Sequence, residues 1–149
     1  MSKIPVLLLI SKRIDLNILN QSPRFRSYRF VSLTAMDYLG GPSTIPASQS
    51  LQGALEKEIR LVRAKYLLAH LGMAFYRYPV AFLTAVMEVQ SLYPDLKIGF
   101  DKGSHHAIQY LELFAAPGPE ITSLSGRIIQ NRSTPEFEQE MAALAACLY

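Results

Sequence analysis

The residues best suited to chemistry in this sequence are two adjacent histidines, His105 and His106, with Asp101 and Glu112 close to them. Imidazole and carboxylate groups can bind metal ions or transfer protons. On the helix expected from about residue 105 to 115, adjacent side chains diverge by about 100°, whereas two metal ligands on one helix usually lie at i and i+4. We therefore predict no metal site. A small hydrolase or transferase centred on the two histidines stays a hypothesis, because active sites are assembled from residues distant in sequence.

Two further residues with chemical potential, His70 and Cys147, lack a supporting motif. His70 lies in a stretch that we expect to be helical, on the polar side of that helix, and a single pair with His105 does not indicate a haem site. Cys147 has no basic neighbour in sequence that would activate a thiolate. No phosphate loop, GxGxxG or GxSxG motif is present. The sequence thus assigns no catalytic residue and no cofactor.

Basic and aromatic residues alternate over residues 24–31, which is the most unusual local composition in the chain. Arginines can hold phosphates while aromatic rings stack on bases. This pattern gives an alternative function, a nucleic-acid-binding regulator. A structural explanation also fits, namely an edge strand whose aromatics pack inward while its arginines face solvent. The nucleic-acid-binding candidates are Arg24, Phe25, Arg26, Tyr28 and Arg29.

A second group of candidates combines arginine and tyrosine, which are enriched at protein-binding hot spots. Arg60 and Arg63 lie on the polar side of an expected long helix, and Arg77 and Tyr78 lie at the corner that follows it. The sequence favours these four residues as protein-binding candidates.

Apolar residues recur at helical spacing from Leu51 to Met73. We expect residues 51–75 to be helical and Pro79 to start a second helix, because proline is favoured at the first helical position. Together they predict a buried αα-hairpin of residues 50–76 and 79–93. The expected core residues are Val62, Tyr66, Leu68, Leu71, Phe82, Val86 and Val89.

The sequence also predicts a C-terminal helix. Thr134 is a candidate N-cap, and Pro135 suits the first helical position. The apolar residues Phe137, Met141, Leu144 and Leu148 form a narrow stripe, which is typical of a helix that docks on one partner. We favour docking within the chain, and association of two copies through this helix stays the alternative.

The remaining segments are less defined by their patterns. Residues 4–10 are continuously apolar, so strand and helix stay open there, and residues 121–130 are equally ambiguous. The alternation at 14–18 slightly favours a strand. We also expect a short strand at residues 96–100.

Length and composition suggest one globular domain over residues 1–149, mainly α with a small N-terminal β element, and α+β as the alternative. The chain has a single cysteine and no stretch that resembles a signal or a membrane span, so we expect a cytoplasmic protein without a membrane partner. Residues 1–65 carry a net charge of +6 and residues 66–149 a net charge of −3. By elimination, the favoured function is a non-enzymatic protein-binding regulator, adaptor or inhibitor that acts through a helical surface.

Overall fold

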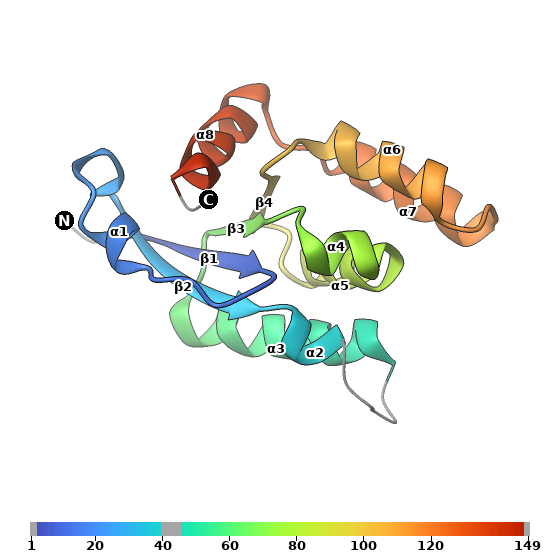
Figure 1. Ribbon diagram of the computed structural model, residues 1–149, viewed down its shortest axis with the longest axis horizontal. Helices are drawn as coiled ribbons and strands as arrows, with labels where there is room; N and C mark the ends of the chain where they lie inside the picture. Colours follow the sequence, from blue (N-terminus) through green and yellow to red (C-terminus); the bar gives the residue numbers. More distant parts are fainter. Residues whose placement is uncertain (1–2, 40–45, 148–149) are drawn as a thin grey trace.

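The computed structural model describes residues 3–39 and 46–147, and within them the chain alternates between strands and helices (Figure 1). The elements in chain order are β1 (Ile4–Ile10), α1 (Asn17–Asn20), the short 3-10 helix η1 (Pro23–Phe25), β2 (Tyr28–Thr34), α2 (Met36–Leu39), α3 (Ala47–Val62), β3 (Tyr66–Ala69), α4 (Met73–Arg77), α5 (Pro79–Leu92), β4 (Lys97–Phe100), α6 (Ser104–Phe114), α7 (Pro119–Gln130) and α8 (Pro135–Ala146).

The strands form one parallel sheet in the order β2-β1-β3-β4. The central strand β1 pairs with β2 along its whole length and with β3 from Val6 to Leu9. A central parallel strand is covered on both faces, which explains why residues 4–10 are continuously apolar instead of alternating.

Helices cover both faces of the sheet, so the architecture is a three-layer α/β arrangement (Figure 1). Leu7 and Leu9 of β1 face the core that contains α3 and α5. Leu8 faces the other core, in which α8 and the segment around α1 pack.

The expectation of a mainly α fold built on an αα-hairpin of residues 50–76 and 79–93 is wrong, because the chain forms a parallel α/β fold. The long helix ends at Val62, where Arg63 adopts a left-handed conformation with φ 55° and ψ 48°. The amide of Ala64 closes the helix on the carbonyl of Ile59. The amide of Lys65 then donates to Pro5 of β1, which leads the chain into β3.

The expected core is confirmed for five of its seven residues, although they pack in an α/β fold and not in a hairpin. Leu68, Leu71, Phe82, Val86 and Val89 are buried, whereas Val62 and Tyr66 are only partly buried. Tyr66 is the first residue of the strand β3. Because side chains alternate along a strand, the next two residues, Leu67 and Leu68, face opposite sides of the sheet.

Several local predictions are confirmed. Pro79 starts α5, and Lys97–Phe100 forms β4. In α8 the hydroxyl of Thr134 accepts from the amide of Phe137 and Pro135 is the first helical residue. The two segments that the sequence left open are a helix at residues 119–130 and a strand at residues 4–10. The strand predicted at 14–18 is wrong, because the short helix α1 begins there. Leu148, the last residue of the expected apolar stripe, lies outside the described residues.

Gly99 in β4 allows α8 to approach the sheet closely. A Cβ at this position would lie 2.6 Å from Cγ of Met141 and 3.1 Å from Cε1 of Phe137. We expect Gly99→Ala to lower the free energy of unfolding by about 1–3 kcal/mol through overpacking, measured by urea denaturation. The control is Gly53→Ala in α3, where a Cβ meets nothing within 4 Å and a gain of about 0.5–1 kcal/mol is expected. Equal stability of both variants would contradict the packing of α8 on β4.

Candidate active site

The four strands end at the same edge of the sheet, which is called here the carboxyl edge. Ser11 directly follows β1, His70 follows β3 and Asp101 follows β4. After β1 the chain forms β2 on one side of that strand and then β3 on its other side. In open parallel sheets, ligands bind outside the carboxyl ends of the strands, where the strand order changes direction in this way. The three polar side chains are therefore placed where this class of fold binds ligands.

His70 and Asp101 form a hydrogen-bonded pair at this edge. Nδ1 of His70 lies 2.5 Å from Oδ2 of Asp101, and Oδ1 of Asp101 accepts from the backbone amide of Leu71 at 2.9 Å. The Asp101 side chain is only 5% exposed, and that of His70 is 17% exposed. Because both carboxylate oxygens are bonded, Asp101 fixes the orientation of the ring. An acceptor at Nδ1 favours the tautomer of the neutral ring that carries its proton there.

Ser11 and Gly72 lie beside the ring of His70. A Cβ at Gly72 would lie 2.3 Å from Nε2 of His70 and 3.2 Å from Oγ of Ser11, so glycine is needed there to leave room for the ring. Ser11 is buried, and its hydroxyl accepts from the amide of Ala74 at 2.9 Å. Ser11 thereby connects the end of β1 to the first turn of α4, next to His70.

A second polar cluster continues the site along α4 and α6. The hydroxyl of Tyr76 lies 2.9 Å from Nε2 of His106 and accepts a hydrogen bond from the ammonium group of Lys102, also at 2.9 Å. Tyr110 donates to the backbone carbonyl of Tyr76. Lys102 follows Asp101 directly and lines the same hollow as the His70–Asp101 pair, while its ammonium group lies against Tyr76.

A hollow of about 470 Å³ connects the pair to α8. It is lined by His70, Asp101 and Lys102 on one side and by three alanines of α8 on the other, Ala142, Ala145 and Ala146. The volume is comparable with the range of about 300–1,000 Å³ of small-molecule sites, although this hollow is shallow and largely open to solvent. The hollow thus joins a proton acceptor, a cation and an apolar wall.

The structure separates the two histidines that opened the sequence analysis. His105 is exposed at the start of α6, whereas His106 is half-buried and turned toward Tyr76, as expected for adjacent helical residues. Asp101 is the residue of that group that reaches the site, with His70 as its partner. Within residues 3–39 and 46–147, no three His, Cys, Asp or Glu side chains gather as a metal site.

The basic and aromatic candidates at 24–31 are mostly absorbed into the fold. Phe25, at the end of η1, and Tyr28, the first residue of the edge strand β2, are buried, so their rings do not face solvent. Arg29 donates to the carbonyl of Val62 at 3.2 Å and so caps the end of α3. Arg24 and Arg26 are exposed.

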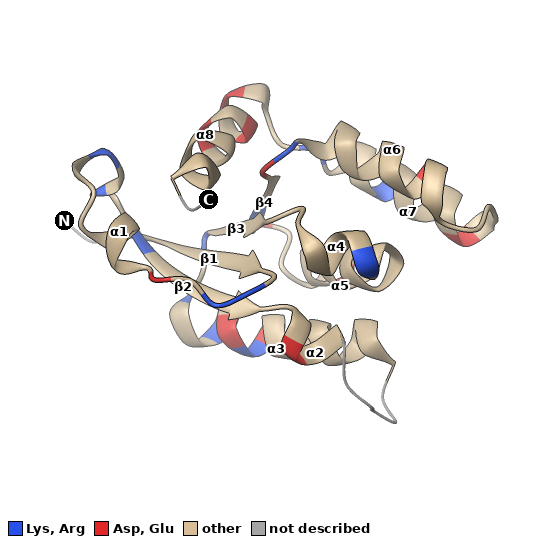
Figure 2. Ribbon diagram, in the orientation of Figure 1, with Lys and Arg blue, Asp and Glu red and all other residues tan. Residues whose placement is uncertain are grey.

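The four protein-binding candidates occupy opposite edges of the sheet. Arg60 and Arg63 lie at the end of α3, beside the edge where the strands begin, whereas Arg77 and Tyr78 lie at the junction of α4 and α5 on the carboxyl side. Figure 2 shows basic residues on α3 and, apart from them, at the junction of α4 and α5. They therefore cannot form one surface. Cys147 is an exposed free thiol at the end of α8.

Sequence reasoning missed the His70–Asp101 pair, although a signal was present. His70 directly follows the apolar residues 66–69, and Asp101 directly follows the expected strand 96–100. Had both runs been taken as parallel strands, the two side chains would have been placed at the same edge of a sheet. The helical periodicity of residues 51–73 concealed the first of these strands.

Comparisons with protein-family models, with curated proteins and with solved structures find no match. The fold and site define a parallel α/β protein with a His–Asp pair at the carboxyl edge of its sheet. Within the described residues, no helix is both long enough and apolar enough to cross a bilayer.

Proposed function

We propose that this protein is a hydrolase that uses the His70–Asp101 pair to activate water against a small ester. The supporting observation is the pair itself, a histidine held at 2.5 Å by a nearly buried carboxylate at the ligand-binding edge of a parallel sheet. A histidine oriented by a carboxylate is the usual general base of hydrolytic sites.

Each residue of the site has a separate role in this reaction. His70 accepts a proton from water as the oxygen attacks the carbonyl carbon, and Asp101 stabilises the imidazolium that forms. The ester C–O bond then breaks and the proton passes to the leaving alcohol. The ammonium group of Lys102 stabilises the negative charge that develops on the carbonyl oxygen. Ser11 is buried and bonded to Ala74, so it positions α4 and water is the nucleophile.

The hollow indicates the kind of substrate. Its size suits a small molecule, the alanines of α8 accept an apolar acyl chain, and Lys102 favours a substrate with an electron-rich group nearby. The sequence centred the hydrolase hypothesis on His105 and His106 of α6. In this proposal the central histidine is His70. The single cysteine supports a reducing compartment, and we propose the cytoplasm.

The test is hydrolysis of p-nitrophenyl acetate by Asp101→Asn compared with the unchanged protein. We expect kcat/KM to fall about 10- to 100-fold, because His70 loses the carboxylate that orients it and stabilises its charged form. The matched control is Asp95→Asn, which alters an exposed aspartate just before the same strand β4 and should leave kcat/KM unchanged. Equal activity of both variants, or no saturable hydrolysis by the unchanged protein, would contradict the proposal.

A further inference from the structure

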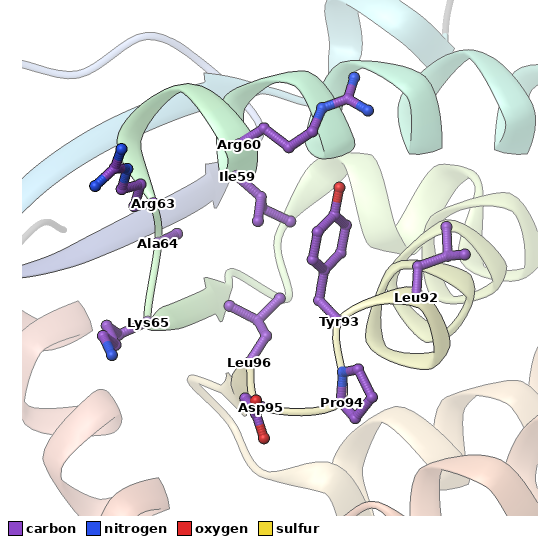
Figure 3. Close-up of a pocket in the computed structure, with 10 residues that line it drawn as sticks. All are labelled: Ile59, Arg60, Arg63, Ala64, Lys65, Leu92, Tyr93, Pro94, Asp95 and Leu96. Carbon is purple, nitrogen blue, oxygen red and sulfur yellow. The ribbon is translucent and has the colours of Figure 1, made fainter.

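A second hollow lies at the opposite edge of the sheet, called here the amino edge, between the ends of α3 and α5. It has a volume of about 670 Å³ (Figure 3). Figure 3 shows Ile59 of α3 and Leu96 pointing toward one another, with the ring of Tyr93 beside them. The accessible apolar interior of the hollow comes from Tyr93 and the exposed Leu92, whereas Ile59 and Leu96, each only 4% exposed, lie beneath it in the core. It shares no lining residue with the hollow at the carboxyl edge.

Three cations line this hollow. In Figure 3, Arg60 passes the hydroxyl end of Tyr93, whereas Arg63 and Lys65 point outward, away from that ring. Among the described residues, the two ion pairs are His70–Asp101 and Arg127–Glu88, and none of the three cations makes a side-chain hydrogen bond or ion pair. The positive charge at this hollow is therefore not neutralised by side-chain contacts.

The nearby negative groups are too weak to account for three cations. Asp95 is the acidic residue of the lining. The carboxyl ends of α3 and α5 add about half a negative charge each at most. A net positive charge stays at the hollow after these contributions, beside an apolar interior of the kind that anchors a side chain.

We propose that the hollow at the amino edge binds an acidic, extended segment of a partner protein, with one apolar side chain of that segment packed against Tyr93 and Leu92. The carboxylates that flank this anchor pair with Arg60, Arg63 and Lys65. An apolar anchor surrounded by complementary charge is the common organisation of a protein-binding site.

A protein segment fits this surface better than a nucleic acid does. Cations can bind a phosphate group without aromatic neighbours. A single-stranded nucleic acid is held in addition by exposed aromatic rings on which its bases stack. The ring of Tyr93 forms a wall of the hollow, and Phe25 and Tyr28 farther along the amino edge are buried. The apolar interior suits a leucine or phenylalanine side chain instead.

The experiment selects random peptides displayed on phage against the unchanged protein. It then measures the best-enriched peptide by fluorescence anisotropy. We expect enrichment of peptides with Asp or Glu on both sides of one large apolar residue. The double variant Arg60→Glu, Arg63→Glu should bind the peptide about tenfold more weakly or worse. The matched control is Arg24→Glu, Arg26→Glu, which reverses two exposed arginines elsewhere on the same edge and should bind unchanged.

Three outcomes would overturn the proposal. One is no enrichment, or an equal loss of binding in both double variants. The second is tight binding of oligothymidylate that both double variants weaken, which would make the whole amino edge a nucleic-acid surface. The third is a concentration-dependent increase in mass by light scattering that only Arg60→Glu, Arg63→Glu abolishes, which would make a second copy of this chain the occupant. Ester hydrolysis by the Arg60→Glu, Arg63→Glu variant should equal that of the unchanged protein. A failure of the peptide-binding proposal therefore leaves the hydrolase proposal intact, and the reverse also holds.

Discussion

Replacing His70 with alanine is expected to lower kcat/KM for p-nitrophenyl acetate by about 10²–10⁴-fold, the usual contribution of a positioned general base. The ring supplies the nitrogen that accepts the proton of water, and no other described side chain bonds to Asp101. Free imidazole should restore part of the lost activity, because the deletion leaves space beside Asp101 for a molecule with the same acid–base chemistry. The measurement is the rate of nitrophenolate release with and without imidazole, compared with the same concentration of imidazole alone.

The control for this prediction is His105→Ala, which removes an exposed imidazole at the start of α6. Its activity should equal that of the unchanged protein, and a melting curve for each variant separates loss of chemistry from loss of folding. If His105→Ala lost as much activity as His70→Ala, or if His70→Ala kept full activity, the assignment of His70 as the base would be wrong.

The helical pattern of residues 51–73 illustrates where sequence reasoning failed. The first three apolar positions, Leu51, Leu55 and Ile59, are indeed the buried positions of α3. Beyond them, β3 is apolar on both faces because it is a central parallel strand, and a short continuous apolar run fits a strand and a helix equally well. The helix stops at Arg63, a non-glycine residue with φ 55°. The usual sequence signal for such a stop, a glycine, is therefore missing.

Elements with strong local signals were predictable. Pro79 and Pro135 lack the amide hydrogen that an interior helical residue must donate, so each marks a helix start regardless of tertiary context. Thr134 satisfies one of the unpaired amides of α8, and that bond depends on neighbouring residues alone. Such features are decided within a few residues, whereas the order of strands in a sheet is decided by contacts far apart in the chain.

The candidate site was not predictable for the same reason. His70 and Asp101 are separated by 31 positions and meet only because β3 and β4 run parallel and end together. Gly72 supports the pair by leaving room for the ring, and its role is visible only once the ring is placed. By contrast, the position of Arg60 on the exposed side of α3 was predictable, while its role in protein binding stays a prediction. A charged helix surface depends on local periodicity, and this periodicity held as far as Val62.

Ending the chain at Ser133, which removes α8, is expected to leave a protein that does not fold stably. The helix buries Phe137, Met141 and Leu144 against the sheet face that carries Val6, Leu8 and Leu68. Burial of one such side chain contributes about 1.5–3 kcal/mol, so the loss is comparable with the total stability of about 5–15 kcal/mol that small proteins have. Circular dichroism and light scattering should show a poorly folded or aggregating chain, and ester hydrolysis should vanish because α8 forms one wall of the hollow.

Point substitutions on α8 separate this packing from the mere presence of the helix. Met141→Ala removes a fully buried side chain and should cost about 2–5 kcal/mol in the free energy of unfolding, measured by urea denaturation. Gln139→Ala, on the exposed side of the same helix, should change it by less than about 0.5 kcal/mol. If α8 instead joined two copies of the chain, the shortened protein would stay folded, and only its mass in light scattering would fall. A folded, monomeric and equally stable shortened chain would contradict the packing of α8, because it would show that the segment around α1 suffices to cover this core.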